Sequence, residues 1–206
     1  MTLTIRIFSD FTCPFCYLAT GLIEQLKQEY DIEAQWLGFE LHPEIPENGV
    51  LLEEKFPEYD LPALFEELRV KGARYGYQFR DCKLLANTRK TLEAAEFARD
   101  HGRHDSFQSA VFQAYFTHGI DIGQIPVILS LAAQAGLDPD ALATALTEGR
   151  YQARVGESRA EGLRFDVSVL PTFVFEGGKR IVGLRSIEPF RQVIKGLPHR
   201  TTLDVV

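Results

Sequence analysis

Two cysteines, Cys13 and Cys16, stand three residues apart in a Cys-Pro-Phe-Cys segment, a spacing that suits thiol–disulfide chemistry. Pro14 follows Cys13, and proline is favoured at the first position of a helix because its missing N–H would have no partner there. Cys13 is therefore predicted to be a helix N-cap, where its sulfur faces free N–H groups and the positive end of the helix dipole, which favour a thiolate. Cys16, one turn in, lies within disulfide reach and deeper. The pair is predicted to be a reversible dithiol.

Two other interpretations of the cysteine pair are open on these residues. Buried cysteine behaves as a small hydrophobic side chain, so the pair could belong to the core. A structural zinc site would need two more ligands, for which Cys82, His101 and His104 are the candidates. No second Cys-x-x-Cys segment exists and the intervals match no common zinc spacing, so the sequence favours a redox pair and no bound metal.

The elements that must position this pair begin with a strand–helix–strand unit. Apolar Leu3, Ile5 and Ile7 alternate along the chain and predict a strand before the cysteines. Apolar residues then recur at intervals of three and four to about residue 29, which predicts a helix, and residues 33–41 predict a second strand. A Cys-x-x-Cys pair beside such a unit is typical of a thioredoxin-like redox motif.

The middle of the chain changes character twice. Residues 42–62 hold several prolines and an Asn48-Gly49 pair, which predict a long loop with at most one turn of helix. A helical pattern then continues from residue 63 to about 165. The expected helices are 63–75, 87–100, 106–117, 125–134, 138–148 and 151–163.

Strand character returns near the end of the chain. Residues 172–175 and 179–182 predict two strands joined by a two-residue Gly177-Gly178 hairpin turn, before a last helix at 187–195. Two half-sheets this small could not bury their faces separately, so they are expected to form one sheet with an insertion between its halves. The fold class is α/β, of order βαβ…ββα. The expected domains are 1–58 and 166–206, the two parts of the sheet domain, and 59–165, an inserted all-helical domain.

The composition excludes several classes of protein. With 206 residues and 45% hydrophobic content the chain can bury a core without disulfides, and three cysteines are too few for an extracellular disulfide framework. A formal net charge of −7 provides no basic surface for nucleic acid. No apolar stretch approaches the ~18 residues of a membrane span, and the N-terminus lacks the pattern of a secretory signal. If Met1 is the natural start, we expect a cytoplasmic protein.

A second segment, Val169-Leu170-Pro171-Thr172, opens the strand expected at 172–175. Proline is tolerated at the start of a strand because it blocks no central ladder bond there, so an ordinary edge strand is one interpretation. The other is a cis Leu170–Pro171 bond packed against the Cys13 turn, with the Leu170 backbone exposed to a bound peptide. The sequence alone does not decide between the two isomers.

These segments together resemble the DsbA family of thiol–disulfide oxidoreductases, over nearly the whole chain. The resemblance rests on Cys13-Pro-Phe-Cys16 and Val169-Leu-Pro171-Thr172 around a helical insertion. The segments that resemble the family's FrnE-like branch, cytoplasmic dithiol–disulfide isomerases linked to polyketide synthesis, are Asp10-Phe-Thr-Cys-Pro-Phe-Cys-Tyr17, Phe39-Glu-Leu-His-Pro43 and Asn87-Thr88. The resemblance implies a thioredoxin-like fold with a large inserted α-helical domain. It also implies that Cys13 attacks, Cys16 resolves and Pro171 is a cis-proline.

The expected function is thiol–disulfide exchange with a protein or small-molecule substrate, as oxidoreductase or isomerase. Substrate contacts are expected at Pro14, Phe15 and Leu170, with no cofactor besides the redox-active disulfide; glutathione as a co-substrate and a homodimer stay open. One alternative is a glutathione-dependent isomerase or transferase of the kappa-class or 2-hydroxychromene-2-carboxylate type, whose members carry serine where Cys13 stands. The other is a non-catalytic protein that binds a client through its helical block. No nucleic-acid or membrane partner is expected.

The sequence departs from the wider superfamily in one respect. Relatives often bury a carboxylate in the strand before the cysteines, as a proton relay for the second cysteine, and the strand around Ile7 offers none. Asp10 and Glu40 are the nearby candidates, but a negative charge there would oppose a thiolate at Cys13. Solvated turn residues are the favoured interpretation of both.

The remaining candidates are expected to be structural. Phe11, Phe15 and Tyr17 are favoured as core residues over an apolar rim for substrate, because Phe15 shares the apolar face of the helix. Cys82 is favoured as a structural thiol in a loop, with a regulatory disulfide as the alternative. The histidines, expected at the surface or at helix caps, are His42, His101, His104, His118 and His199.

Overall fold

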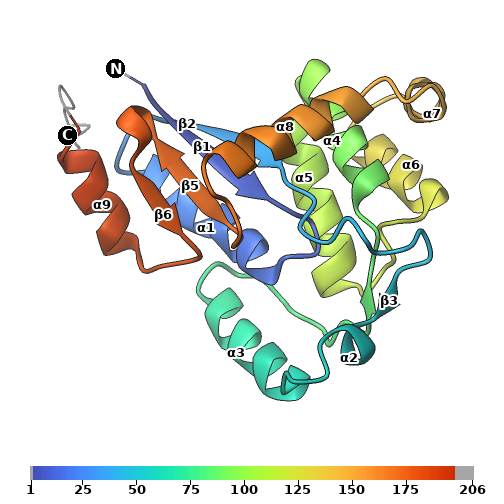
Figure 1. Cartoon of the computed structure of the whole chain (residues 1–206), viewed down its shortest axis with the longest axis horizontal. Coiled ribbons are helices and arrows are strands. Elements are labelled where there is room, and N and C mark those ends of the chain that lie inside the picture. The colour runs from blue at the N-terminus through green and yellow to red at the C-terminus, as the bar shows by residue number, and fades with distance from the viewer. Residues whose placement is uncertain (1, 198–206) are drawn as a thin grey trace.

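A mixed four-stranded sheet in the order β2-β1-β5-β6 organises the computed structural model, which describes residues 2–197 (Figure 1). β1 (Leu3–Ser9) lies parallel to β2 (Ile32–Gly38) and antiparallel to β5 (Thr172–Phe175). β6 (Arg180–Val182) extends the sheet beside β5. Strands from the two ends of the chain therefore pair directly, which confirms one sheet with a long insertion.

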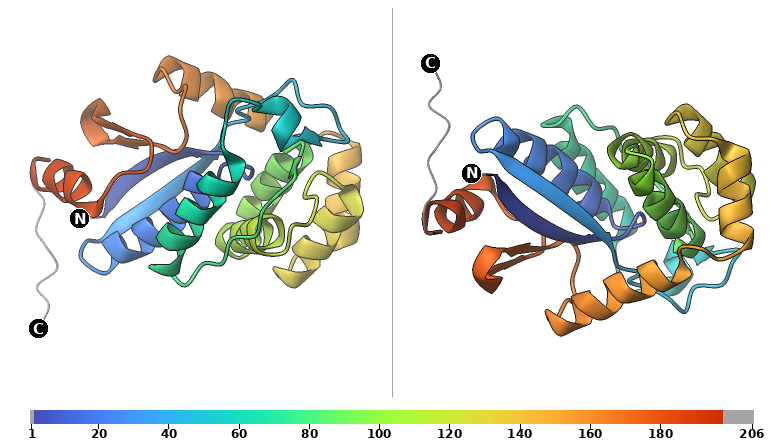
Figure 2. Two further views of the ribbon diagram at one scale, coloured as in Figure 1. Left: turned by 90° about the horizontal axis from the view of Figure 1, so that it is seen from below. Right: turned by 90° about the horizontal axis from the view of Figure 1, so that it is seen from above.

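Helices cover both faces of this sheet (Figure 2). The side chains of Ile5 and Ile7 form one core cluster with α1 (Pro14–Lys27) and α9 (Ile187–Lys195). α8 (Gln152–Arg164) lies on the opposite face, where a Cβ atom at Gly162 would stand only 2.6 Å from the ring of Phe39. A larger residue at Gly162 would therefore push α8 off the sheet.

The chain between β2 and β5 is mostly helical, as the sequence pattern predicts. Besides α8, its α-helices are α2 (Leu52–Lys55), α3 (Leu61–Ala73), α4 (Arg89–Asp100), α5 (His104–Phe112), α6 (Ile125–Gln134) and α7 (Pro139–Thr147). Asp138 caps α7 by accepting hydrogen bonds from the N–H groups of Asp140 and Ala141, the expected pairing of a cap with a first-turn proline.

Three predictions about this architecture need correction. The insertion is not all-helical, because β4 (Leu84–Leu85) pairs with β3 (Val50–Leu51) of the preceding loop. The helix expected at 106–117 changes to a π-helix at Gln113–Thr117. The hairpin turn has three residues, Glu176–Gly178, because the Phe175 N–H bonds the Lys179 carbonyl in the register of the β5–β6 ladder and leaves three residues between them. Two-residue strands and local changes of helix type leave no hydrophobic period in the sequence.

The first long helix of the insertion, α3, packs beside α1, the helix that begins at the cysteine pair. Figure 2 shows α1 and α3 side by side, and residues of these two helices are in contact. The N-terminus of α1 thus lies between the sheet and the inserted helices. Within residues 2–197 no helix has both the length and the hydrophobicity needed to cross a bilayer. His199 and the rest of the tail lie outside the described residues.

Candidate functional site

Cys13 occupies the predicted position at the end of the β1–α1 turn. It is the N-cap of α1, with an extended backbone (φ −86°, ψ 111°) and Pro14 at the first helical position. The side chain does not cap the helix, which corrects the prediction that its sulfur faces the free N–H groups. The thiol instead lies 3.6 Å from the Leu170 carbonyl, to which it donates a hydrogen bond, and it is half-buried. The sulfur is therefore accessible from the side of the Leu170 segment.

Cys16 lies one turn further along α1 and is fully buried, with a side-chain contact to Cys13. Burial raises the pKa of the Cys16 thiol well above its ordinary value, and the neighbouring Cys13 raises it further. The Ser9 hydroxyl and the Asp10 backbone N–H both contact the sulfur and oppose this rise in pKa. The structure therefore brings together one accessible and one shielded thiol, as the spacing predicts.

The Leu170–Pro171 bond is cis, which decides a question that the sequence left open. Thr172 follows it as the first residue of β5 and pairs with Phe8 of β1, so that the cis bond lies next to the Cys13 turn. The Pro171 carbonyl is bound by the Gly183 N–H at 2.8 Å, whereas the Leu170 carbonyl points to Cys13. Residues 157 positions apart in the chain thus form one wall of the site.

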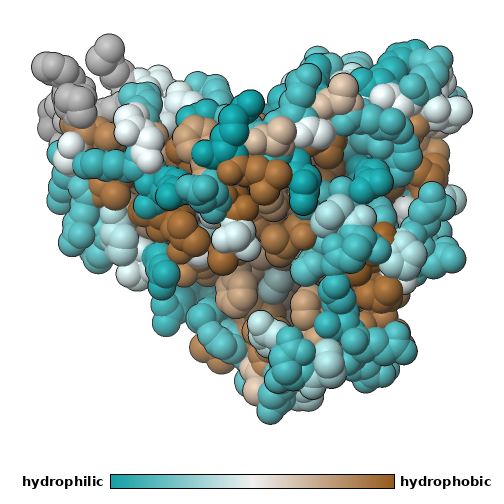
Figure 3. All heavy atoms as spheres, viewed as in Figure 1, coloured by the Kyte–Doolittle hydropathy of each residue, from teal (hydrophilic) through white to brown (hydrophobic). Residues whose placement is uncertain are grey.

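An apolar pocket of about 440 Å³ opens beside Cys13, between the sheet domain and the inserted segment. Figure 3 shows hydrophobic residues gathered in a hollow at the centre of this face. The residues that line the pocket are Thr12, Cys13, Pro14, Phe15, Leu41, His42, Leu52, Phe56, Tyr59, Leu61, Leu64, Phe65, Leu68, Cys82, Leu85, Tyr115, Phe116, Ser168, Val169 and Leu170. None is Asp, Glu, Lys or Arg. A pocket of this size and lining suits an uncharged, largely apolar group.

The prediction that Asp10 is a solvated turn residue is wrong. Its side chain is 2% exposed, and its carboxylate accepts hydrogen bonds from the Leu41 N–H at 2.9 Å and from the N–H and hydroxyl of Thr12 at 3.2 Å. Burial raises the Asp10 pKa, while these donors and the Thr88 hydroxyl lower it. Asp10 therefore connects the Cys13 turn by hydrogen bonds to the chain segment that follows β2.

Glu40 is also buried, which corrects the same prediction for this residue. Its carboxylate is held by both the Nε and Nη2 atoms of Arg89, at the start of α4. A two-pronged pair of this kind fixes geometry as well as charge. Glu40 therefore connects the sheet domain to the insertion, and its carboxylate is occupied by a fixed partner.

Cys82 lies on the wall of the same pocket, but it belongs to the inserted segment. It is 7% exposed, and its thiol donates to the Tyr115 carbonyl at 3.4 Å. Burial, with a smaller contribution from Asp81, raises its pKa to about 12. These features agree with the structural role that the sequence favoured.

Of the three aromatic candidates, two are core and one lines the site. Phe11 and Tyr17 are buried, and each packs against Phe112 with ring centroids about 5 Å apart. Phe15 is only partly buried and lies on the pocket wall. The core prediction is therefore confirmed for Phe11 and Tyr17, whereas Phe15, in the first turn of α1, lies on the pocket wall.

The histidines occupy varied positions, and one of them lines the pocket beside Cys13. His101 ends α4 and donates to the Phe97 carbonyl at 2.8 Å, as expected of a capping residue, and His118 is exposed. His42 lines the pocket. Across residues 2–197 no three His, Cys, Asp or Glu side chains are placed to hold a metal ion. The zinc site that Cys82, His101 and His104 would complete thus has no such cluster in this part of the chain.

One residue at the site escaped prediction from the sequence. Ser9 is the last residue of β1, is 6% exposed, and contacts the Cys16 thiol. The strand period gives a signal that could have found it, because Ser9 follows Ile5 and Ile7 on the face of β1 that α1 covers. A polar side chain at a core position calls for a partner.

Comparison with known proteins gives one family and several similar structures. The sequence model of the DSBA-like thioredoxin domain family matches residues 4–195. Protein YwbO of Bacillus subtilis is 26% identical over 203 residues, which cover 94% of this chain and 96% of YwbO. A probable DsbA oxidoreductase from Streptomyces coelicolor superposes with a TM-score of 0.88 at 22% identity, covering 99% of this chain and 94% of the other.

Two further structures share the fold at lower identity. A 2-hydroxychromene-2-carboxylate isomerase superposes with a TM-score of 0.75 at 18% identity, covering 92% of each chain. The cytosolic disulfide reductase DsbM from Pseudomonas aeruginosa superposes with a TM-score of 0.65 at 19% identity, covering 94% of this chain and 97% of DsbM, and it has also been solved with GSH. The α/β fold expected from the sequence is thus the fold of these proteins.

Proposed function

Because the chain belongs to the DSBA-like thioredoxin domain family, we propose that it exchanges thiols and disulfides through Cys13 and Cys16. The observation that carries the proposal is the asymmetry of the two sulfurs. Cys13 is half-buried on the wall of a pocket, and Cys16 is fully buried behind it in the same turn. One sulfur that a substrate can reach and one that it cannot suit attack by the first and resolution by the second.

In the reducing direction the Cys13 thiolate attacks one sulfur of a substrate disulfide. The substrate S–S bond breaks, a mixed disulfide with Cys13 forms, and the first substrate thiolate leaves. The Cys16 thiolate then attacks the Cys13 sulfur and releases the second substrate thiolate. Two electrons pass from the enzyme dithiol to the substrate, and the Cys13–Cys16 disulfide remains. The oxidising direction is the reverse.

The residues around Cys13 supply the substrate contacts of this proposal. The Leu170 carbonyl, 3.6 Å from the sulfur, accepts a hydrogen bond from the Cys13 thiol and is free for a substrate N–H once that thiol has reacted. This carbonyl immediately precedes Pro171 in the cis Leu170–Pro171 bond. Pro14 and Phe15 provide apolar contact surface on the other side of the sulfur.

The pocket lining favours an apolar substrate, either a hydrophobic segment of a protein or a neutral small disulfide. Glutathione carries carboxylates, and no lysine or arginine lines the pocket to pair with them. Lys71 lies 5.7 Å from the centre of the Phe15 ring, but its ammonium group is paired with Glu67. We expect faster reaction with neutral hydroxyethyl disulfide, an unactivated dialkyl disulfide, than with oxidised glutathione.

Mass spectrometry and a reductase assay test the proposed function. Alkylation of the oxidised protein followed by peptide mapping is expected to find one reversible Cys13–Cys16 disulfide. The Cys13→Ser variant is expected to lose insulin reduction with dithiothreitol as the reductant, and the Cys82→Ala variant to keep it. Full insulin reduction by Cys13→Ser would refute the proposal.

The glutathione-dependent alternative has one supporting observation, the fold shared with a 2-hydroxychromene-2-carboxylate isomerase. It predicts an activity that requires glutathione and survives the Cys16→Ser substitution. The dithiol mechanism predicts the opposite, because loss of Cys16 leaves the mixed disulfide unresolved.

Three finer predictions go with this proposal. We propose membership of the FrnE-like branch, a cytoplasmic location and a homodimer as expectations from the sequence. Light scattering on the purified protein measures the oligomeric state, and fractionation of the source cells measures the location.

A further inference from the structure

Cys16 must lose its thiol proton before its sulfur can attack, because only the thiolate is nucleophilic. Its side chain is fully buried, so bulk water cannot take the proton directly. Burial also favours the neutral thiol at this position. The exchange proposed above, on which this inference rests, therefore requires a path for the proton from Cys16 to solvent.

The side chains around Cys16 leave one candidate for the first step of that path. Asp10 contacts the sulfur through its backbone N–H, while its carboxylate accepts hydrogen bonds from Leu41 and Thr12. Cys13 is the sulfur under attack. The Ser9 hydroxyl also contacts the Cys16 sulfur, and a hydroxyl can accept one proton while it donates another.

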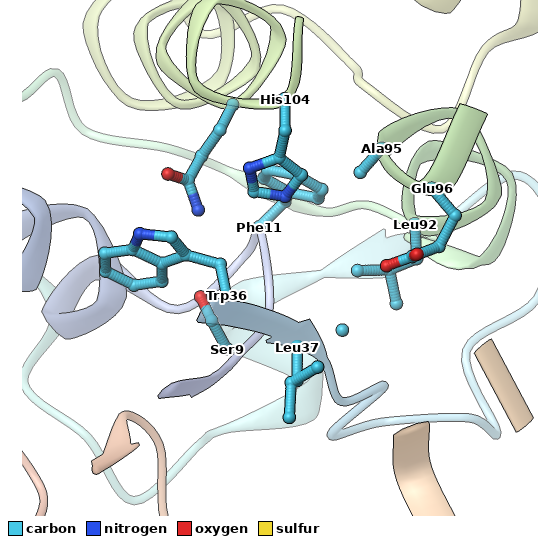
Figure 4. A pocket seen from close by; sticks show the side chains of 10 residues that line it. Ser9, Phe11, Trp36, Leu37, Leu92, Ala95, Glu96 and His104 are labelled. Atoms are coloured by element: carbon cyan, nitrogen blue, oxygen red, sulfur yellow. The ribbon is translucent and has the colours of Figure 1, made fainter. Parts of the chain in front are cut away.

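Ser9 lies at the same time on the wall of a small cavity (Figure 4). The cavity has a volume of about 20 Å³. That is room for about one water molecule, which needs at least ~10–15 Å³ and two to four polar partners. Glu96 of α4 and two residues of α5, His104 and Gln108, supply polar groups to the same cavity as Ser9.

One polar group of the cavity, the His104 side chain, is also partly exposed to solvent. His104 reaches into it from α5, with a side chain that is 12% exposed and an Nδ1 atom 3.4 Å from Asp105. The Glu96 carboxylate lies on another side and is paired with Arg99 at 3.2 Å and Arg154 at 3.6 Å. Glu96 and His104 are thus the charged or titratable groups on the cavity wall, and their ion-pair partners are Arg99, Arg154 and Asp105.

We propose that Ser9 relays the Cys16 proton to a water molecule in this cavity, which passes it to solvent along His104 and Gln108. As the Cys16 sulfur attacks Cys13, its proton moves to the Ser9 oxygen, and the Ser9 hydroxyl proton moves to the water. The S–S bond between Cys13 and Cys16 forms, and the bond from Cys13 to the substrate sulfur breaks. The substrate leaves as a thiolate, so that protons and electrons balance.

Stopped-flow reaction of the reduced full-length protein with neutral dithiodipyridine separates the two steps. The first phase of pyridinethione release reports attack by Cys13, and the second reports resolution by Cys16. Removing one hydrogen bond to a charged group costs enough to slow a step about tenfold. Ser9→Ala is therefore expected to slow the second phase about tenfold at pH 7 and to move its pH profile to higher pH, with the first phase unchanged.

Two variants and one isotope measurement complete the test. Ser9→Thr restores the hydroxyl and is expected to restore the second phase. Ser158→Ala removes another buried hydroxyl, on α8, and is the matched control with both phases unchanged. Gln108→Leu, which removes a polar wall of the cavity, is expected to slow the second phase as Ser9→Ala does. In D2O the second phase of the unsubstituted protein is expected to slow more than the first.

The outcomes separate the relay from the proposed function itself. If the unsubstituted protein shows no two phases, the proposed exchange reaction is refuted, and the relay is refuted with it. Two normal phases together with an unchanged second phase in Ser9→Ala or in Gln108→Leu would refute the relay alone. Equal slowing of both phases would show a general structural effect and would also refute it. If Ser9→Ala does not fold, Gln108→Leu and the isotope measurement decide.

Discussion

Two thiols line one pocket in this protein and differ in almost everything else. Cys13 stands at the N-terminus of α1 in the sheet domain, half-buried, with Leu170 as its hydrogen-bond acceptor. Cys82 stands in the irregular chain between α3 and β4, buried, with Tyr115 as its acceptor. The chemistry of the residue is identical. The difference teaches that the reactivity of a cysteine depends on access and on what surrounds the sulfur, since both decide how readily a thiolate forms and meets a substrate.

The residues that hold Cys13 in place also differ from those that hold Cys82. The turn before Cys13 is fastened by the buried Asp10 carboxylate, and a second thiol, Cys16, lies behind it. Among the described residues, Cys82 is a free thiol, and it lies in a segment held by the short β3–β4 pair. The Cys13 turn thus holds two sulfurs, those of Cys13 and Cys16, in a fixed relation. The segment of Cys82 buries a single sulfur at the edge of the pocket.

The largest expected contrast is in the rate of alkylation. A thiol with a pKa of about 12 has a thiolate fraction at pH 8 that is about a thousandfold below that of a free cysteine. We therefore expect iodoacetamide to label Cys82 at least about a thousandfold more slowly in the native protein than in urea, while Cys13 reacts in the native state. Peptide mapping over time measures both rates. Similar native rates for Cys13 and Cys82 would abolish the contrast.

Removal of the Asp10 carboxylate tests whether the Cys13 turn needs its anchor. Asp10→Ala removes a buried carboxylate and leaves the N–H groups of Leu41 and Thr12 without this acceptor, which is expected to lower the free energy of unfolding by about 2 kcal/mol at pH 7. Urea unfolding measures the change, and Asp10→Asn, which keeps one oxygen, is expected to lose less. An unchanged midpoint for Asp10→Ala would show that the turn holds without the carboxylate.

The same variant has a defined dependence on pH. The Asp10 pKa is raised in the folded protein, so between its unfolded value near 3.8 and its folded value the native state binds more protons than the unfolded state. The stabilisation from this group is complete below the unfolded pKa and is lost as the pH rises through the folded pKa. The advantage of the unsubstituted protein over Asp10→Ala is therefore expected to be greater at pH 5 than at pH 7.

Substitution of Cys82 is expected to have a smaller effect, on stability alone. Cys82→Ala removes a buried sulfur, which costs about 1 kcal/mol at pH 7. Because the Cys82 pKa rises from 9.0 to about 12 on folding, its contribution is lost as the pH increases from 9 towards 12, at up to about 1.4 kcal/mol per pH unit. Urea unfolding is expected to show that the free energy of unfolding of the unsubstituted protein exceeds that of Cys82→Ala at pH 8, and that this difference has closed or changed sign at pH 10. A constant gap would mean that Cys82 is not buried as described.

The smallest expected effect concerns the pocket itself. Phe15→Ala removes apolar surface beside Cys13 and is expected to lower kcat/KM for dithiodipyridine about fivefold. Phe15→Leu is the matched control, which keeps most of that surface, and Cys82→Ala is expected to change the rate less than Phe15→Ala does. An equal loss with oxidised glutathione would indicate a general effect on Cys13 and not an apolar contact.

Much of the fold followed from local patterns in the sequence. Pro14 placed Cys13 at a helix N-cap, Asp138 and Pro139 marked the start of α7, and the apolar periods located β1, α1 and α9. Each of these signals acts between residues a few positions apart, where backbone geometry and period are set by the chain itself. The α/β class and the family resemblance depended on the same segments.

The tertiary structure decided what lies around the two sulfurs. Whether Asp10 is solvated or buried depends on Leu41 and Thr88, and the direction of the Cys13 thiol depends on Leu170, which is 157 positions away. The pocket likewise needs the sheet domain and the inserted segment together. The sequence determined that two thiols stand at a helix N-terminus, because that is a local property. Only the folded chain decided where the Cys13 thiol points and that Asp10 is buried beside it, because both depend on residues brought together from distant parts of the sequence.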